Sequence, residues 1–280
     1  MDRRFQLIDV FHEGQFSGNP LAVVLDAEDL TTEQMQKITR WLNLSETTFL
    51  LPPIVEGADY RVRIFTLERE MPFAGHPTLG SCHAWLTAGG NPYKENEIIQ
   101  ECGAGLIPIR HAETQYAFAA PALIHGREVE TSKIQEVANF LGIDVSTIVD
   151  AQWADNGPGW VAILLNSADE ALALDPRRSY SSQIDVGVVG PYLPGSPITL
   201  ELRAFFTDHN GIVVEDPVTG SLNASVAQWL LSSGRVSAPY TASQGTKIGR
   251  TGRIHISQDE AGSIWVGGKA TTLFSGICLF

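Results

Sequence analysis

Hydrophobic and polar positions alternate, or cluster in short runs, along most of the chain. Alternation with a period of two predicts strands, whereas apolar residues three or four apart predict amphipathic helices. Strands are predicted at residues 5–10, 21–25, 47–51, 60–66, 97–110, 114–119, 160–165, 198–206, 247–256, 263–268 and 271–280. Helices are predicted at residues 31–42, 77–88, 132–141 and 216–232.

The helix predicted at residues 216–232 has the clearest start and stop signals. Asp216 is expected to cap its first turn, because a carboxylate accepts hydrogen bonds from the free N–H groups there. Pro217 suits the first helical position, where no N–H is needed. Gly234 follows as the usual left-handed stop. Such a helix start can serve as a structural cap or hold a small polar ligand.

The same pattern occurs at half the chain length. Internal repeats indicate duplicated architecture, and here the two copies share one offset of 140 positions. The matching pairs are Arg63 and Arg203, Phe65 and Phe205, Pro77 and Pro217, Gly80 and Gly220, Ser81 and Ser221, and Ala84 and Ala224. The offset pairs His76 with Asp216, and the helix at 132–141 is expected to be the counterpart of the helix at 33–42. Duplication is the interpretation that we adopt.

Each half is therefore predicted to be a strand-rich unit with one strongly apolar helix. A helix with a broad apolar surface must be covered by sheet on most sides. Two curved sheets, each wrapped around its own helix, fit this pattern. A cleft between the halves would bring the two helix starts together, and domain interfaces are common ligand sites.

Composition and charge exclude several classes of protein. The chain has 280 residues, 44% of them hydrophobic and 18% charged, which is typical of a globular protein. Its net charge of −13 argues against nucleic acid and against anionic membrane surfaces, both of which require basic patches. The longest apolar runs are strand-length, too short to span a membrane.

The cysteines and the N-terminus favour a cytoplasmic location. Cys82, Cys102 and Cys278 are few, odd in number and irregularly spaced, which suggests reduced thiols. The first residues lack the apolar run of a signal peptide.

Single polar residues near strand ends are the candidates for chemistry. Glu46 precedes the strand at 47–51, where partial desolvation would raise its pKa toward the range of a general base. Asn19 could line the cleft or simply form a Gly-Asn-Pro turn. A metal site is poorly supported, because His76 and His83 are seven positions apart with no completing ligand. No phosphate-binding glycine loop is present, and residues 245–252 are predicted to form a hairpin turn.

Taken in order, several short motifs resemble the PhzF-like phenazine-biosynthesis isomerase family, within the diaminopimelate epimerase-type fold. Each motif is weak alone, but their order along the chain is specific. They are the segments at residues 18–24, 43–49, 73–80 and 215–221, together with Gln244-Gly245 and Gly249-Arg250.

The resemblance implies an α+β fold of two pseudo-repeated domains, each a barrel-like, mostly antiparallel sheet wrapped around a central helix. Domain boundaries are expected at residues 1–122 and 123–280, with a last strand at about 271–280 that crosses back to the first domain. The resemblance also implies a cofactor-independent isomerase that moves a proton within a small carboxylated metabolite, such as trans-2,3-dihydro-3-hydroxyanthranilate. Glu46 would be the general acid/base in an interdomain cleft.

Further residues are assigned to the site by the motifs and the repeat. His76 is expected to orient a substrate group or assist proton movement, and Asp216 to cap its helix and accept a hydrogen bond from the substrate. A substrate carboxylate should avoid Asp216. Its expected partners are backbone N–H groups near Gly75, Gly220 and Ser221 and the hydroxyl groups of Ser45 and Ser221.

Two other functions remain open. One is an amino-acid racemase or epimerase, although the two-cysteine version is disfavoured because neither helix start carries a cysteine and Cys82 lies about one and a half turns inside its helix. The other is a metabolite-binding protein without turnover. The expected partner is a small molecule, not nucleic acid or membrane, and a homodimer is expected because it is the commonest soluble oligomer.

Overall fold

The computed structural model describes residues 2–280, and they divide into two compact units. Unit 1 comprises Met1–Ala119 and Gly267–Phe280, and unit 2 comprises Ala120–Val266. The last strand, β16 (Ile264–Leu279), therefore begins in unit 2 and ends in unit 1. No helix within residues 2–280 combines the length and apolarity of a membrane span.

Unit 1 is a closed barrel around one helix. Its strands are β1 (Asp2–Val10), β2 (Asn19–Val24), β3 (Glu46–Leu51), β4 (Tyr60–Thr66), β5 (Glu70–Met71), β6 (Glu97–Cys102), β7 (Gly105–Ala112) and β8 (Gln115–Ala119). The order β1-β2-β3-β4-β6-β7-β8-β16 closes because β16 also pairs with β1 in antiparallel register. The short β5 pairs only with β4.

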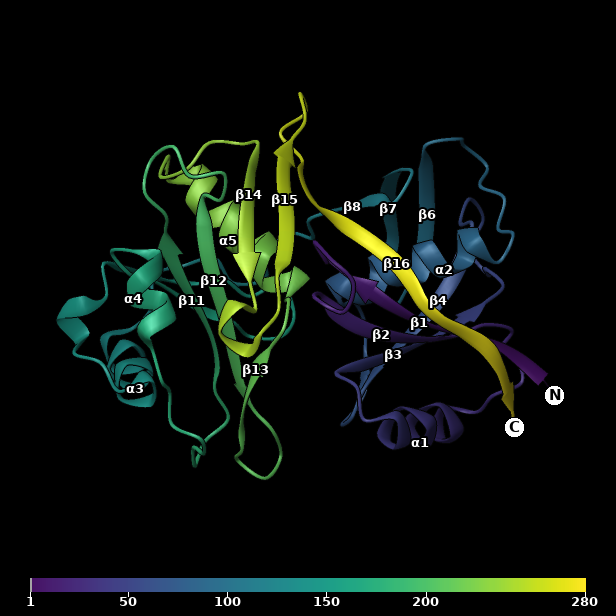
Figure 1. Cartoon of the computed structure of the whole chain (residues 1–280), viewed down its shortest axis with the longest axis horizontal. Helices are drawn as coiled ribbons and strands as arrows, with labels where there is room; N and C mark the ends of the chain where they lie inside the picture. The colour runs from purple at the N-terminus through teal and green to yellow at the C-terminus, as the bar shows by residue number, and fades with distance from the viewer. Residues whose placement is uncertain (1) are drawn as a thin grey trace. The chain divides into compact units, whose positions relative to one another are not determined.

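The barrel of unit 1 encloses α2 (Gly75–Thr87), whose residues from Gly75 to Ala84 are all buried. This helix contacts β1, β2, β3, β4, β6 and β8, and it lies behind β16 in Figure 1. Its buried surface includes apolar residues together with His76, Thr78, Ser81 and His83, so the sheet covers the helix on most sides. By contrast, α1 (Thr32–Leu42) is amphipathic and covers the outside near β3 and β4.

Unit 2 has the same kind of sheet, open at one edge and wrapped around α5 (Gly220–Ser232). Its strands are β9 (Asp150–Trp153), β10 (Val161–Leu164), β11 (Asp185–Pro191), β12 (Leu200–Thr207), β13 (Val213–Asp216), β14 (Tyr240–Gln244) and β15 (Gly252–Gln258). Two further helices, α3 (Thr131–Leu141) and α4 (Ala168–Ala173), and two short 3₁₀ turns, at Val145–Thr147 and Thr246–Ile248, complete it. The turn at residues 245–252 joins β14 to β15, as the sequence predicts.

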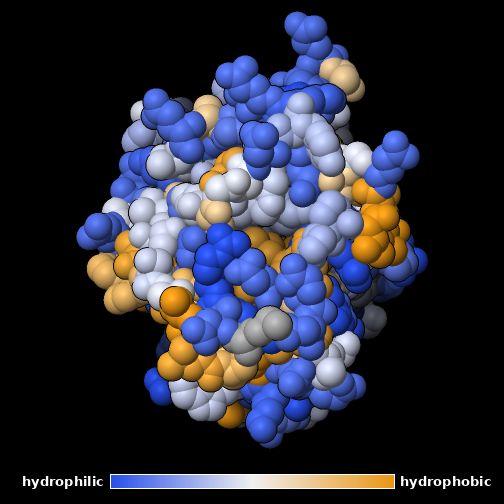
Figure 2. Space-filling view, turned by 90° about the vertical axis from the view of Figure 1, so that its right-hand side faces the viewer, coloured by the Kyte–Doolittle hydropathy of each residue, from blue (hydrophilic) through white to orange (hydrophobic). Residues whose placement is uncertain are grey.

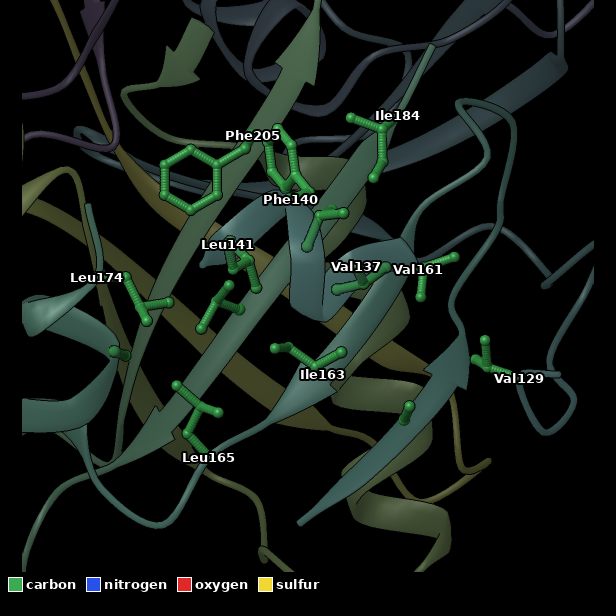
Figure 3. Packing of buried hydrophobic residues seen from close by; sticks show 14 residues of the cluster. Val129, Val137, Phe140, Leu141, Val161, Ile163, Leu165, Leu174, Ile184 and Phe205 are labelled. Carbon is green, nitrogen blue, oxygen red and sulfur yellow. The ribbon is translucent and has the colours of Figure 1, made fainter. Parts of the chain in front are cut away.

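One hydrophobic cluster holds α3 against the sheet of unit 2. Figure 3 shows Phe140 and Leu141 of α3 together with Ile163 of β10 and Phe205 of β12. The sequence predicts α3 within one residue at its N-terminus. However, α4 and not α3 lies between β10 and β11, which is where α1 lies between β2 and β3, so the predicted equivalence of α3 with α1 is wrong.

The surface of unit 1 exposes apolar side chains along the last part of β16. Phe274, Ile277 and Leu279 are more than half exposed, and Phe280 follows them. Figure 2 shows apolar patches among hydrophilic atoms on the side that faces right in Figure 1.

The strands confirm the sequence repeat at its offset of 140 residues. Arg63 of β4 forms an ion pair with Glu70 and lies over the Phe65 ring. Arg203 of β12, 140 residues later (203 − 63), does the same with Glu215 and Phe205. Glu215, however, lies 145 residues after Glu70 (215 − 70), because the hairpin from Phe205 to its partner Glu215 is five residues longer than the hairpin from Phe65 to its partner Glu70.

The central helices follow the longer offset of 145 residues. α2 begins at Gly75 and α5 at Gly220, and both are 13 residues long. His76 and Ser221 are therefore the second residues of equivalent helices. The expected pairing of His76 with Asp216 is wrong: by strand register Asp216 pairs with Ala204 as Met71 pairs with Ile64.

Both helix starts also differ from the prediction. Asp216 is the last residue of β13, and Thr219 is the N-cap of α5. In the first half, α2 begins two residues before Pro77. Pro77 is tolerated there because the third N–H of a helix has no partner within the helix.

Candidate functional site

Three predicted site residues come together in unit 1. Asn19 begins β2, Glu46 begins β3, and His76 is the second residue of α2. Asn19 Nδ2 lies 3.4 Å from His76 Nδ1, and His76 Nε2 lies 3.7 Å from Glu46 Oε2. Asn19 and His76 are buried, whereas 18% of the Glu46 side chain is exposed. Solvent therefore reaches the Glu46 side chain best of the three, although the Oε2 atom that faces His76 is itself buried.

The His76 ring is neutral at pH 7. Burial lowers its pKa to about 3, because the low-dielectric interior disfavours the charged imidazolium. The 3.7 Å contact with Glu46 is therefore not an ion pair at neutral pH, although the two groups lie within ion-pair distance. With the Asn19 amide nitrogen donating to Nδ1, the ring proton resides on Nε2, the nitrogen nearer to Glu46.

The loop before β2 fixes Asn19. Asp9 accepts hydrogen bonds from the backbone N–H groups of Ser17 and Gly18, at 3.0 and 2.8 Å. A Cβ on Gly18 would lie 2.1 Å from the carbonyl oxygen of Val10, so only glycine fits. This tight turn places Asn19 opposite Val10 in the antiparallel pair of β1 and β2.

The strand register brings Glu46 to the same end of the barrel as Asn19. β2 and β3 are parallel, with Ala22 opposite Thr47, so both strands begin at the same edge. α2 is fastened to β3 by the hydrogen bond from Ser81 Oγ to Thr48 Oγ1, at 2.9 Å. The predicted binding residues Ser45 and Gly75 directly precede Glu46 and His76, respectively.

In unit 2, Asp216 belongs to a buried polar network that the sequence reasoning missed. The Thr219 hydroxyl donates to Asp216 Oδ2 at 2.5 Å, and Gln244 Nε2 donates to Thr219 Oγ1 at 2.9 Å and to the Asp216 carbonyl at 3.1 Å. Asn223 Nδ2 donates to Gln244 Oε1 at 2.9 Å. The motif Gln244-Gly245 was the available signal for Gln244, because it is among the family-like segments.

Ser221 lies one residue into α5 and has partners from a neighbouring loop. Trp160 Nε1 donates to Ser221 Oγ at 3.2 Å, and Asn156 Nδ2 donates to the Ser221 carbonyl at 2.9 Å. Gly220 begins the helix beside it. The sequence places Trp160 at the start of a strand and provides no signal that it contacts α5.

Cys82 lies inside α2 and not at its start. It is buried, and burial raises its pKa well above the usual value for a thiol. A protonated, inaccessible thiol is a poor acid/base. Within residues 2–280, no group of three or more His, Cys, Asp or Glu side chains is arranged to hold a metal ion.

Comparison with known proteins identifies the family of the chain. Residues 8–276 match the family model described as phenazine biosynthesis-like protein. The chain is 38% identical to antisense-enhancing sequence 1 of Schizosaccharomyces pombe, over 98% of each protein. It is 34% identical to a trans-2,3-dihydro-3-hydroxyanthranilate isomerase of Pseudomonas fluorescens, over 88% of this chain and 87% of that protein.

A solved structure supports the same placement. A predicted epimerase from Pseudomonas aeruginosa superposes with a TM-score of 0.80 at 26% identity, over 99% of both chains. The predicted diaminopimelate epimerase-like α+β fold is confirmed. This chain therefore belongs to the phenazine biosynthesis-like family and is an isomerase of the PhzF type.

Proposed function

We propose that the protein moves a proton between two carbon atoms of a small carboxylated metabolite, with Glu46 as the general acid/base. The observation that carries the proposal is Glu46, whose side chain is partly exposed and whose buried Oε2 atom lies 3.7 Å from a neutral, buried imidazole. The substrate named for several curated relatives, trans-2,3-dihydro-3-hydroxyanthranilate, is of this class.

The proposed reaction uses the Glu46 carboxyl group twice, first as a base and then as an acid. Glu46 takes a proton from one carbon, the electron pair of the broken C–H bond shifts into the neighbouring π system, and the Glu46 acid, which can exchange its proton with solvent, delivers a proton to a second carbon. The carboxylate is regenerated, so the step balances without a further reactant. His76 acts as a neutral hydrogen-bond donor through Nε2, because an imidazole with a pKa of about 3 is not charged at neutral pH.

The substrate-binding part of the proposal extends to residues of both halves. Ser45, Gly75 and Asn19 belong to it in unit 1, and Asp216, Gly220 and Ser221 in unit 2. In this proposal Asp216 accepts a hydrogen bond from the substrate. The hydrogen-bond donors at the start of α5 bind the carboxylate of the substrate.

A two-thiol racemase is disfavoured by the burial and the high pKa of Cys82. A racemase that uses Glu46 with a second acid/base, or a binding protein without turnover, makes different predictions. The first inverts the chirality of the product. The second binds ligand without exchanging its protons.

Proton exchange tests the proposal. Incubated in heavy water with trans-2,3-dihydro-3-hydroxyanthranilate, the wild type should isomerise the substrate and incorporate deuterium. Glu46→Gln should lower the rate by at least about 100-fold, because an amide cannot accept the proton. Glu97→Gln is the matched control, since Glu97 also begins a strand and its ion pair with Lys94 is on the surface. Unchanged isomerisation by Glu46→Gln would refute the assignment.

A further inference from the structure

A short loop in unit 2 holds Trp160 against the start of α5. Asp155 Oδ1 accepts hydrogen bonds from the N–H groups of Gly157 and Gly159, both at 2.8 Å. Both glycines have positive φ, 144° and 93°, which other residues rarely adopt. Trp160 follows directly, is buried, and its carbonyl accepts from the N–H of Ala154. The backbone of Trp160 and of the loop before it is thus held by hydrogen bonds.

The chemistry of the indole decides the direction of its hydrogen bond with Ser221. An indole N–H can only donate, so Ser221 Oγ must be the acceptor in the 3.2 Å contact with Trp160 Nε1. The hydroxyl proton of Ser221 then lies outside this hydrogen bond. No acceptor for it is present among residues 2–280, although 93% of the residue's surface is covered, since Ser221 is 7% exposed.

The neighbouring hydroxyl shows the contrast. The proton of Thr219 goes to Asp216, and its lone pair accepts from Gln244. Thr219 is therefore fully used inside the network, while Ser221 keeps one donor. A hydroxyl group that is available only as a donor favours a ligand group that accepts hydrogen bonds, such as a carboxylate oxygen.

The repeat places a comparable contact in unit 1. His76, the structural equivalent of Ser221, receives the side chain of Asn19 from the start of β2. Trp160 directly precedes β10, which corresponds to β2 because each is the parallel neighbour of the next strand, β11 or β3. In both halves, a residue near the start of this strand fixes the second side chain of the central helix.

We propose that Trp160 is a positioning residue: its indole N–H occupies a lone pair of Ser221 Oγ and so commits the Ser221 hydroxyl to donate to a carboxylate oxygen of the substrate. This inference deepens the proposed function and rests on its assignment of Ser221 to substrate binding. It adds a residue that acts through Ser221, and it gives the physical reason why the Ser221 hydroxyl donates to the carboxylate that the proposed function assigns to it.

Ligand binding tests this role without requiring turnover. Titration calorimetry should compare 3-hydroxyanthranilate, an aromatic analogue that carries the carboxylate, with 2-aminophenol, which lacks it. Trp160→Phe keeps the ring but removes the donor, and it should weaken binding of 3-hydroxyanthranilate about tenfold while leaving 2-aminophenol within about twofold. Trp265→Phe is the matched control, because Trp265 is equally buried and its indole donates to Asp259 instead.

A second variant separates positioning from general damage. Ser221→Ala should lose the same preference for the carboxylate, and the double variant Trp160→Phe/Ser221→Ala should bind 3-hydroxyanthranilate no more weakly than Ser221→Ala alone. Equal weakening of both ligands, additive effects in the double variant, or no binding of 3-hydroxyanthranilate by the wild type would overturn the proposal. Failure of the proposed isomerase chemistry would appear separately, as undiminished proton exchange by Glu46→Gln.

Discussion

At the scale of single residues, the pairing of Glu46 with a neutral histidine is the main electrostatic feature of unit 1. A charged imidazolium beside Glu46 would stabilise the carboxylate and weaken it as a base. Burial prevents this by holding the pKa of His76 at about 3. At 3.7 Å the two groups are not hydrogen-bonded, so His76 places an uncharged ring beside the carboxylate, which suits the proposed role of Glu46 as a group that both takes and delivers a proton.

The neutral His76 makes the protein sensitive to acid. Because its pKa is about 3 when folded and 6.5 in a model peptide, the unfolded chain binds a proton that the folded chain does not, over the range between those values. Stability should therefore fall as the pH falls below 6.5. At pH 5 the loss due to His76 should be about 2 kcal/mol relative to pH 8.

The measurement is the free energy of unfolding in urea at pH 8 and pH 5, for the wild type and His76→Asn. Asparagine retains an acceptor near the position of Nδ1 but does not titrate, so the variant should lose about 2 kcal/mol less on acidification. His83, whose pKa is also lowered by burial, is present in both proteins and cancels. Equal losses in the two proteins would contradict the neutral, buried state of His76.

At the scale of elements, the glycine turn before β2 is the tightest part of the candidate site. Gly18→Ala should destabilise the protein by about 2–3 kcal/mol, because its Cβ would meet the Val10 carbonyl at 2.1 Å. Gly14→Ala in the same loop is the control: no atom lies within 4 Å of its added Cβ, and the change should stay within about 0.5 kcal/mol. Chemical denaturation measures the free energy of unfolding of both variants. Equal losses of stability in the two variants would contradict the prediction that Gly18 has no room for a side chain.

The repeated Arg–Glu pair has unequal burial in the two halves. Arg203 is 3% exposed. Its guanidinium also donates to the carbonyl oxygens of Ala171 and Leu174, near the end of α4. Its equivalent Arg63 pairs with Glu70, which is 39% exposed. The same contact is therefore expected to matter far more in unit 2.

Charge removal in each copy tests that inequality. Glu215→Gln leaves a buried guanidinium without its counter-charge and should cost about 3 kcal/mol. Glu70→Gln acts on a solvent-screened pair and should cost less than about 1 kcal/mol. Thermal and urea unfolding of the two variants provide the comparison, and equal costs would mean that burial does not control the strength of this pair.

At the scale of the whole molecule, unit 1 depends on the C-terminal strand β16 to complete its sheet. Unit 1 closes only through the pairing of β16 with β1, which extends from Asp2 opposite Leu279 to Val10 opposite Ala270. Without that strand, β1 would expose an unpaired edge and the barrel would lose its cover over α2.

Fragments should show this dependence. Residues 1–119 alone should fail to fold, whereas the same segment joined to residues 267–280 by a short linker should fold cooperatively. Circular dichroism and thermal melts measure the outcome. A stable, cooperative fragment 1–119 would show that β16 is dispensable for the barrel.

The sequence determined much of the local structure and the family. Alternating strands, the apolar helices near residues 75–88 and 220–232 and the repeated Arg–Phe pattern all follow from local periodicity and from residues that recur at a fixed spacing. Local sequence can do this because strand and helix periods depend on neighbouring side chains. The motifs that resemble the phenazine-biosynthesis isomerase family, and not the periodicity, brought Asn19, Glu46 and His76 into consideration as site residues.

Only the tertiary structure decided which residues of the two halves correspond. The hairpin from Phe205 to Glu215 is five residues longer than its counterpart from Phe65 to Glu70, so Ser221 rather than Asp216 is equivalent to His76. It also determined the partners of those residues: the Asn19 contact, the Thr219–Gln244 network and the Trp160 hydrogen bond join segments 57, 25 and 61 positions apart. Such contacts depend on strand register and burial, which arise only when distant segments pack together, and no local pattern encodes them.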